Sequence, residues 1–189
     1  SACVYNLKKQ DETFIENLKE EDAYPAQPED GYGWEKLFSE RMCKHFEEDY
    51  GIEARIVRYH NVYGPIGTYD GGREKVPAAL CRKIAYAKKN KLDTIEIWGD
   101  GKQTRSFMFI EDCIKGTKMI FNSNFNKPIN LGTSNQVSIN QLCEIIEKIA
   151  NYNVKKRYLL DKPLGVRGRS SDNTLIKSQF NWEPNYDLK

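Results

Sequence analysis

The sequence lacks the patterns that define several common classes of protein. Its five cysteines are widely spaced without a C-x-x-C pair, and its two histidines lack metal-ligand spacing, so neither a disulfide framework nor a metal site is predicted. No hydrophobic run approaches the roughly 18 residues of a membrane span. The 29 basic and 27 acidic side chains nearly cancel, so the charge predicts binding neither to nucleic acid nor to a membrane. The cysteine content favours the reducing cytoplasm.

The elements that are present predict an α/β fold. The small and β-branched residues Ser1–Tyr5 predict the end of a buried strand, and Arg55–Tyr59 predict another. Between them, apolar residues recur at helical spacing from Tyr32 to about Asp49, and Gly51 follows as a stop signal. This order of strand, loop, helix and strand predicts a parallel sheet, with the active site beyond the carboxyl ends of the strands.

The remainder of the chain predicts a smaller lobe and then a second α/β stretch. Residues 62–107 are rich in glycine and proline and contain a predicted helix at Pro77–Asn90 and a strand at Thr94–Trp98. The elements expected after them are helices near Glu111–Phe121, after Ser138 as N-cap and after Ser171, and strands at Pro128–Leu131 and near Lys156–Leu160.

Tyr32 and Lys36 form a candidate catalytic pair. A phenol and an ammonium four residues apart at a helix start project from the same face. The pKa of a free phenol is roughly 10, and a nearby cation favours the phenolate, which can accept the proton of a hydroxyl group. The Y-x-x-x-K spacing also arises by chance in ordinary surface pairs, so the surrounding segments decide its meaning.

Those segments resemble a known family. They are Ser1-Ala2-Cys3-Val4-Tyr5, His60-Asn61-Val62-Tyr63-Gly64-Pro65, Arg105-Ser106-Phe107, Asn130-Leu131-Gly132 and Trp182-Glu183-Pro184. Together with the Y-x-x-x-K helix they resemble the extended short-chain dehydrogenase/reductase family of sugar-nucleotide epimerases and dehydratases. The resemblance implies the C-terminal part of a Rossmann-type parallel sheet with a smaller sugar-nucleotide-binding lobe. It also implies NAD as cofactor, with Tyr32 and Lys36 binding it, and a homodimer.

The same resemblance divides the chain into two parts. Residues 1–61 would be the C-terminal part of the NAD-binding domain, and residues 62–189 a substrate-binding lobe whose strands and helices return to the Rossmann sheet. The family's G-x-x-G-x-x-G loop is not in the sequence. We therefore expect a partial sequence, with the cofactor-binding half before Ser1 and a further helix after Lys189.

Cys3 and Lys75 narrow the choice among the reactions that members of this family catalyse. A dehydratase of this family would carry Thr-Asp-Glu where this chain has Ser1-Ala2-Cys3, and elimination of water needs those carboxyl groups. The segments Gly71-Gly72-Arg73-Glu74-Lys75 and Gly165-Val166-Arg167-Gly168-Arg169 resemble the members that epimerise GDP-mannose at C3 and C5. That likeness implies a GDP-sugar substrate and makes Cys3 and Lys75 the acid/base pair, with their assignment to the two carbons open. The alternatives are a 4-epimerase on another nucleotide sugar, or a non-catalytic binding fragment.

Further residues are expected to contact the substrate. Arginine binds a diphosphate in bidentate geometry, which favours Arg105 and Arg167 for this role. The other candidates match substrate positions of the family and are Ser1, Ala2, Asn61, Glu74, Val76, Lys83, Gln103 and Thr104. The cysteines other than Cys3, which are Cys43, Cys81, Cys113 and Cys143, are expected to be buried small hydrophobes, and His45 and His60 to be structural.

Overall fold

The structure, a computed structural model, describes residues 1–188. Its helical elements are the 3₁₀ helices η1 Ala2–Val4, η2 Leu7–Gln10 and η3 Glu20–Ala23 and the α-helices α1 Gly31–Tyr50, α2 Val76–Asn90, α3 Ile110–Phe121, α4 Ile139–Ala150 and α5 Thr174–Phe180. Its strands are β1 Val57–Tyr59, β2 Asn61–Tyr63, β3 Thr94–Trp98, β4 Thr104–Arg105, β5 Phe107–Phe109, β6 Ile129–Leu131, β7 Val137–Ser138, β8 Lys155–Leu159 and β9 Gly168–Arg169.

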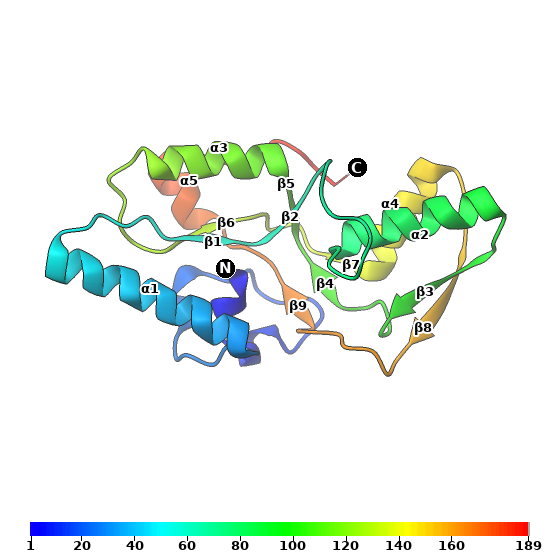
Figure 1. The fold of residues 1–189 in the computed structure, drawn as a ribbon, viewed down its shortest axis with the longest axis horizontal. Coiled ribbons are helices and arrows are strands. Elements are labelled where there is room, and N and C mark those ends of the chain that lie inside the picture. Colours follow the sequence, from blue (N-terminus) through cyan, green and yellow to red (C-terminus); the bar gives the residue numbers. More distant parts are fainter. Residues whose placement is uncertain (189) are drawn as a thin grey trace.

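Most strand pairs are parallel, as the sequence predicts. β1 pairs with β6, β2 with β5 and β3 with β8, all in parallel. β4 lies between β9, which is parallel to it, and β7, which is antiparallel. α3 and α5 pack on one side of β1 and β6, while α1 and the N-terminal segment lie on the other side (Figure 1). Segments from both ends of the chain therefore meet at one short pair of strands.

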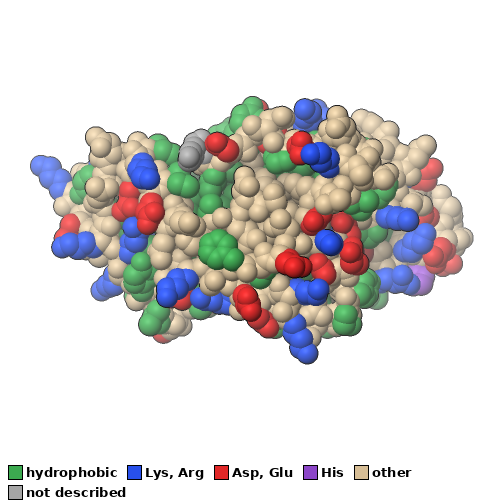
Figure 2. All heavy atoms as spheres, turned by 180° about the vertical axis from the view of Figure 1, so that it is seen from behind, with side chains coloured by type: hydrophobic (Ala, Val, Ile, Leu, Met, Phe, Trp, Pro, Cys, Tyr) green, Lys and Arg blue, Asp and Glu red, His purple; other side chains and the backbone are tan. Residues whose placement is uncertain are grey.

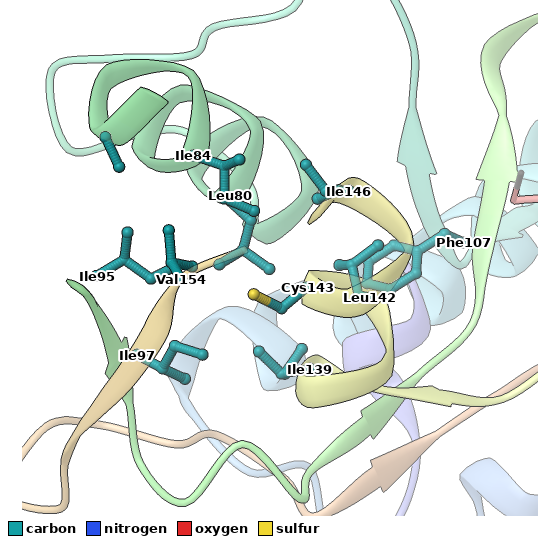
Figure 3. Close-up of a cluster of buried hydrophobic side chains, with 11 residues drawn as sticks. Leu80, Ile84, Ile95, Ile97, Phe107, Ile139, Leu142, Cys143, Ile146 and Val154 are labelled. Atoms are coloured by element: carbon teal, nitrogen blue, oxygen red, sulfur yellow. The ribbon is translucent and has the colours of Figure 1, made fainter. Parts of the chain in front are cut away.

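Three clusters of buried hydrophobic side chains hold these layers together. The largest joins α2 and α4 to β3 and includes Leu80, Ile84 and Leu142 (Figure 3). Burying each such side chain contributes about 1.5–3 kcal/mol. A second cluster joins α3 and α5 to β6, and a third joins η1 to α1 through Leu37. The division of the chain into residues 1–61 and 62–189 stays a prediction. Residue 189, the last of the second part, lies outside the described residues.

The predicted helices agree with the structure to within a few residues. α1 begins after Asp30, whose carboxylate accepts a hydrogen bond from the backbone N–H of Gly33 at 2.8 Å, and it ends at Tyr50, with Gly51 as the C-cap. Ser138 is the N-cap of α4, as predicted, and forms a capping box with Gln141. Clear helical periodicity and capping chemistry therefore located these elements.

The prediction of a strand at Ser1–Tyr5 is wrong. These residues form η1, where the Val4 N–H donates to the Ser1 carbonyl at 3.3 Å and the Cys3 N–H to the Ser1 hydroxyl at 3.2 Å. Local hydrogen bonds thus replace the ladder bonds that a strand requires. The expected burial is confirmed, because Val4 and Tyr5 are fully buried. The small and β-branched residues of this segment therefore predicted its burial correctly but not its backbone conformation.

Two of the four cysteines expected to be buried are exposed. Cys113 and Cys143 are buried, but Cys43 and Cys81 are not. α1 buries only Gly33 and Leu37, so the later turn that carries Cys43 faces outward. α2 buries Leu80, Ile84 and Ala87 along one stripe, and Cys81 lies beside that stripe.

The described surface carries charges of both signs. Lysine and arginine side chains are interspersed with aspartate and glutamate over the face seen in Figure 2, and hydrophobic side chains form small separate groups there. Within residues 1–188, every helix is too short or too polar to cross a membrane.

Candidate active site

The start of α1 brings Tyr32 and Lys36 together. The Lys36 ammonium lies 5.1 Å from the centroid of the Tyr32 ring, so the two side chains share one face of the helix, as the spacing predicts. Both side chains are accessible, and Lys36 also donates to the Glu35 carboxylate at 2.8 Å. This hydrogen bond and the charge of Glu35 raise the pKa of Lys36. A cation therefore stays beside the phenol.

Cys3 lies directly against the start of α1. A Cβ atom at Gly33 would overlap the carbonyl oxygen of Cys3, so only glycine allows the helix to approach this closely. Ser1 and Ala2 belong to the same turn, η1, in which Ala2 is buried. The backbone thus places the thiol-bearing residue next to the residue that follows Tyr32.

Arg169 brings the C-terminal part of the chain into contact with the Cys3 thiol. It lies on β9 and is 8% exposed, and its Nη1 is 3.5 Å from the Cys3 sulfur. Its Nε donates to the Gln10 side-chain oxygen at 2.6 Å. Its Nη2 is buried and lies 3.8 Å from a carboxylate oxygen of Glu29, but it makes no hydrogen bond with any residue that the structure describes. A buried donor without a partner is costly, and an anionic ligand would satisfy it.

Arg105 lies beside Arg169. The two residues are partners in the parallel register of β4 and β9, so two guanidinium groups share one face of the site. Burial, and then the charge of Arg169, lower the pKa of Arg105 to about 10. Within residues 1–188, Arg105 donates to the backbone carbonyls of Thr104 at 2.7 Å and Leu164 at 3.4 Å and to no side chain. Two close cations facing one carboxylate make a site suited to an anion.

Arg167, the second arginine predicted to bind substrate, has a partner of its own. Its two Nη atoms each lie 3.1 Å from an oxygen of Asp100, in a bidentate ion pair. The hydrogen bonds from Arg167 lower the pKa of Asp100. In this structure the side chain ties the turn after β3 to the segment before β9.

Lys75 lies apart from the thiol. It is the N-cap residue of α2 and lines a cavity of about 930 Å³ between that helix and the loop at residues 62–75. Gly71 and Gly72 in this loop have φ angles of +87° and +82°, as close backbone bending at paired glycines requires. Among the described residues that line this cavity, neither Cys3 nor Tyr32 is found.

The neighbours of Lys75 make mostly local contacts. The Glu74 carboxylate accepts from the Gly72 N–H at 2.7 Å and from Arg82 at 2.8 Å. Val76 is the exposed first residue of α2. Lys83 donates to the Glu96 carbonyl at 2.7 Å, and burial lowers its pKa. The contacts of Glu74 hold the loop against α2, and the contact of Lys83 holds α2 against β3.

The remaining predicted residues lie near β4. Asn61 donates to the Ser106 carbonyl at 3.1 Å, and the Thr104 hydroxyl donates to the Thr13 carbonyl. Gln103 donates to the Trp98 carbonyl at 3.1 Å, while its own side-chain oxygen is buried without a hydrogen-bond partner among the described residues. That oxygen is a further group that a ligand would satisfy.

His60 is buried behind the site, as expected of a structural histidine. Its ring lies 5.8 Å from that of Tyr5, and its Nε2 is 3.4 Å from the Asn130 side-chain oxygen. Burial, followed by the charge of Arg169, lowers the pKa of His60 to about 3. The imidazole is therefore neutral at physiological pH.

Sequence reasoning missed three residues of this cluster, which are Gln10, Glu29 and Arg169. The segment Gly165–Arg169 offers two arginines at alternate positions, and the pattern alone does not say which one faces Arg105. Gln10 and Glu29 lie in the polar stretch before α1, where no motif marks them. Only the fold shows that they reach β9.

The chain matches known proteins along its whole length. The model of the NAD dependent epimerase/dehydratase family matches residues 1–132. GDP-mannose 3,5-epimerase of Arabidopsis thaliana is 49% identical over 189 residues, covering 100% of this chain and 49% of the relative. UDP-glucuronate 4-epimerase of Thermodesulfobacterium geofontis is 32% identical over 177 residues, covering 93% of this chain and 50% of the relative. The chain spans about half the length of the curated relatives it matches.

Solved structures share the fold. UDP-glucose 4-epimerase from Thermotoga maritima, with UDP-glucose, has a TM-score of 0.83 at 24% identity, covering 97% of this chain and 58% of that one. UDP-glucuronic acid 4-epimerase from Bacillus cereus, with UDP-glucuronic acid and NAD, has a TM-score of 0.76 at 25% identity, covering 97% and 56%. These likenesses confirm the predicted Rossmann-type α/β class.

Proposed function

The chain belongs to the NAD dependent epimerase/dehydratase family, and on that basis we propose that the protein epimerises GDP-mannose at C3 and C5 to GDP-L-galactose. The reaction would pass through a transient 4-keto intermediate, with NAD as the cofactor. The observation that carries the proposal is Cys3, whose backbone carbonyl lies against Gly33 at the start of α1 and whose sulfur accepts from Arg169 Nη1 at 3.5 Å. A simple 4-epimerisation needs no such acid/base group.

Tyr32 and Lys36 would serve the redox step at C4. The Tyr32 oxygen would accept the proton of the C4 hydroxyl, with the Lys36 ammonium 5.1 Å from the centroid of the Tyr32 ring. A bound NAD would supply the hydride-transfer chemistry for C4, and Tyr32 and Lys36 would be the residues of this chain that hold it. The shared face of the two side chains at a helix start fits the part of the cofactor site that this chain supplies.

Cys3 and Lys75 would invert the two neighbouring carbons. A ketone at C4 acidifies the hydrogens at C3 and C5, so a base on one face of the ring and an acid on the other can invert each centre. Arg169 Nη1 donates to the Cys3 sulfur at 3.5 Å, which places a cation beside this proposed acid/base group. Lys75 would approach from the loop that carries Gly71 and Gly72, and either residue can serve either carbon.

Arg105 and Arg169 would bind the diphosphate of the substrate. Both are partly or fully buried, they are neighbours in the β4–β9 register, and the Nη2 atom of Arg169 has no hydrogen-bond partner. A diphosphate supplies the negative charge that this pair lacks. The other proposed substrate contacts are Ser1, Ala2, Asn61, Glu74, Val76, Lys83, Gln103, Thr104 and Arg167.

We also propose a cytoplasmic homodimer. Trp34 and Phe38 on α1 are 50% and 64% exposed, and together with Tyr24 they line a hollow of about 440 Å³. Aromatic side chains in a concave patch are common in protein interfaces. The five free cysteines are consistent with a reducing compartment. Residues 1–61 and 62–189 would contribute to the NAD-binding and substrate-binding parts, respectively.

Solvent exchange tests the proposed reaction. The complete enzyme, incubated with GDP-mannose and NAD in deuterated water, should incorporate deuterium at both C3 and C5. Cys3→Ser should reduce exchange at one of these carbons by at least about 100-fold, since general acid/base groups contribute that much. Cys43→Ser, at an exposed cysteine of α1, is the matched control and should exchange normally. Absence of deuterium from both carbons with the wild-type enzyme would refute the proposal.

A 4-epimerase acting on another nucleotide sugar is the second candidate. It is favoured by the position of Lys75, which lines a cavity without Cys3, and by the 32% identity to UDP-glucuronate 4-epimerase. Such an enzyme would invert C4 without exchanging any carbon-bound hydrogen with solvent. The same experiment, repeated with UDP-sugars, therefore separates the two candidates.

A further inference from the structure

Gln10 is a fully buried polar side chain to which the proposed reaction assigns no role. It ends η2, at 0% exposure. Its side-chain oxygen accepts the Nε–H of Arg169 at 2.6 Å, and its side-chain nitrogen lies 3.3 Å from each of the carbonyls of Tyr5 and Asn6. All three contacts agree on one orientation of the amide, because the donor faces carbonyls and the acceptor faces a guanidinium.

The contact with Gln10 determines where Arg169 points. A guanidinium is planar and rigid, so a bond at Nε fixes the directions of both Nη atoms. With Nε held by Gln10, Nη1 faces the Cys3 sulfur at 3.5 Å and Nη2 remains without a hydrogen bond. Removing the acceptor would free the plane to rotate, and the contact with the sulfur would be lost.

A neutral acceptor suits this position. A carboxylate at residue 10 would also accept the Nε–H, but it would pair with the charge of Arg169 and would face the carbonyls of Tyr5 and Asn6. Glutamine fixes the guanidinium and leaves its positive charge available to the thiol and to the ligand. Glu29, at 3.8 Å, is the nearest acidic group and forms no hydrogen bond with Arg169.

We propose that Gln10 is a positioning residue that acts through Arg169 on Cys3. The inference rests on the proposed function, because it assumes that Cys3 transfers a proton at one of the two carbons. It predicts a larger effect at that carbon than at the other one. A loss of general stability, by contrast, would slow exchange at both carbons equally.

The ratio of the exchange rates at C3 and C5 tests the inference. Cys3→Ser first identifies the carbon that the thiol serves. Gln10→Met removes the acceptor at similar size and should slow exchange at that carbon by about tenfold, the effect of losing a hydrogen bond to a charged group, while the other carbon changes less than about twofold. Lys9→Met places the same side chain one position earlier on η2, where it removes only the ion pair with Asp22, and should leave the ratio unchanged.

The outcomes of these measurements distinguish the proposed function from the positioning role of Gln10. If the wild-type enzyme exchanges neither carbon, the proposed function is wrong and the inference falls with it. If the wild-type enzyme exchanges both and Gln10→Met slows both equally, or neither, the positioning role alone is wrong. Should Gln10→Met fail to fold, Arg169→Lys keeps the charge and Gln10 but lacks the Nε–H. An unchanged ratio in that variant would also overturn the inference.

Discussion

Removing Glu40 should destabilise the protein strongly, because it would leave a buried cation without its partner. Arg58 on β1 is 2% exposed, and Glu40 on α1 is 10% exposed. Their bonds are bidentate, at 3.0 Å from Nε and 2.8 Å from Nη2. The guanidinium also donates to the Glu20 carbonyl at 2.6 Å and lies 5.3 Å from the centroid of the Tyr5 ring.

The expected cost follows from this burial. In Glu40→Ala only one of the three hydrogen bonds of Arg58 would remain, and breaking a buried ion pair in this way costs about 3–5 kcal/mol. At a urea slope of about 2 kcal/mol/M, the midpoint of unfolding would fall by about 1.5–2.5 M. Glu53→Ala removes an ion pair in which the glutamate is 77% exposed, and should cost roughly 0–1 kcal/mol.

Equilibrium urea unfolding of the two variants and the wild type measures both values. The double variant Arg58→Met with Glu40→Leu should recover most of the loss, since apolar residues can replace a buried pair at little cost. A midpoint for Glu40→Ala as close to wild type as that of Glu53→Ala would refute the reasoning. A double variant no more stable than Glu40→Ala would show that the loss arises from packing and not from the unpaired charge.

Three further predictions test the site itself. Gly33→Ala should lower kcat at least about 100-fold by displacing the Cys3 backbone, while Gly31→Ala, whose Cβ would meet nothing within 4 Å, should keep full activity in steady-state assays. Because the pKa of His60 is about 3 in the native state and about 6.5 in the unfolded state, the unfolded state binds more protons between these values. Stability should therefore fall by about 1.4 kcal/mol per pH unit below pH 6.5, and His60→Gln should remove this slope in urea unfolding at pH 7, 6 and 5. Arg105→Met should raise the Tm without ligand by removing a repelled cation, yet it should lose the stabilisation by GDP that gives the wild type about 2.7 kcal/mol at 100 times Kd. A flat pH dependence in the wild type, or equal GDP stabilisation of both proteins in thermal shift assays, would contradict the last two.

The helices of this protein could be predicted from sequence because their signals are local. Apolar periodicity and the Ser138 cap located α4, and the spacing of Tyr32 and Lys36 gave the shared face at the start of α1. Parallel pairing is confirmed, although one of the strands used to predict it, Ser1–Tyr5, forms η1 instead. Strands of two or three residues, such as β4 and β9, are too short to show a period of two.

The surroundings of Cys3 could not be predicted, because they depend on contacts between distant segments. Arg169 is 166 residues from Cys3 in the sequence and 159 residues from Gln10. No pattern within either segment encodes those contacts. Which of Arg167 and Arg169 lies beside Arg105 likewise depends on a distant contact, because Asp100, in the turn after β3, forms an ion pair with Arg167. Sequence therefore indicated the chemical groups, and the fold determined which of them meet.

The contact between Gly33 and Cys3 also bears on how the site moves. Here α1 touches η1 main chain to main chain, with no flexible side chain between them. A displacement of the helix is therefore passed on to the thiol-bearing turn directly, without being absorbed by a change of rotamer. A movement of α1 would therefore shift the backbones of Tyr32 and Cys3 together.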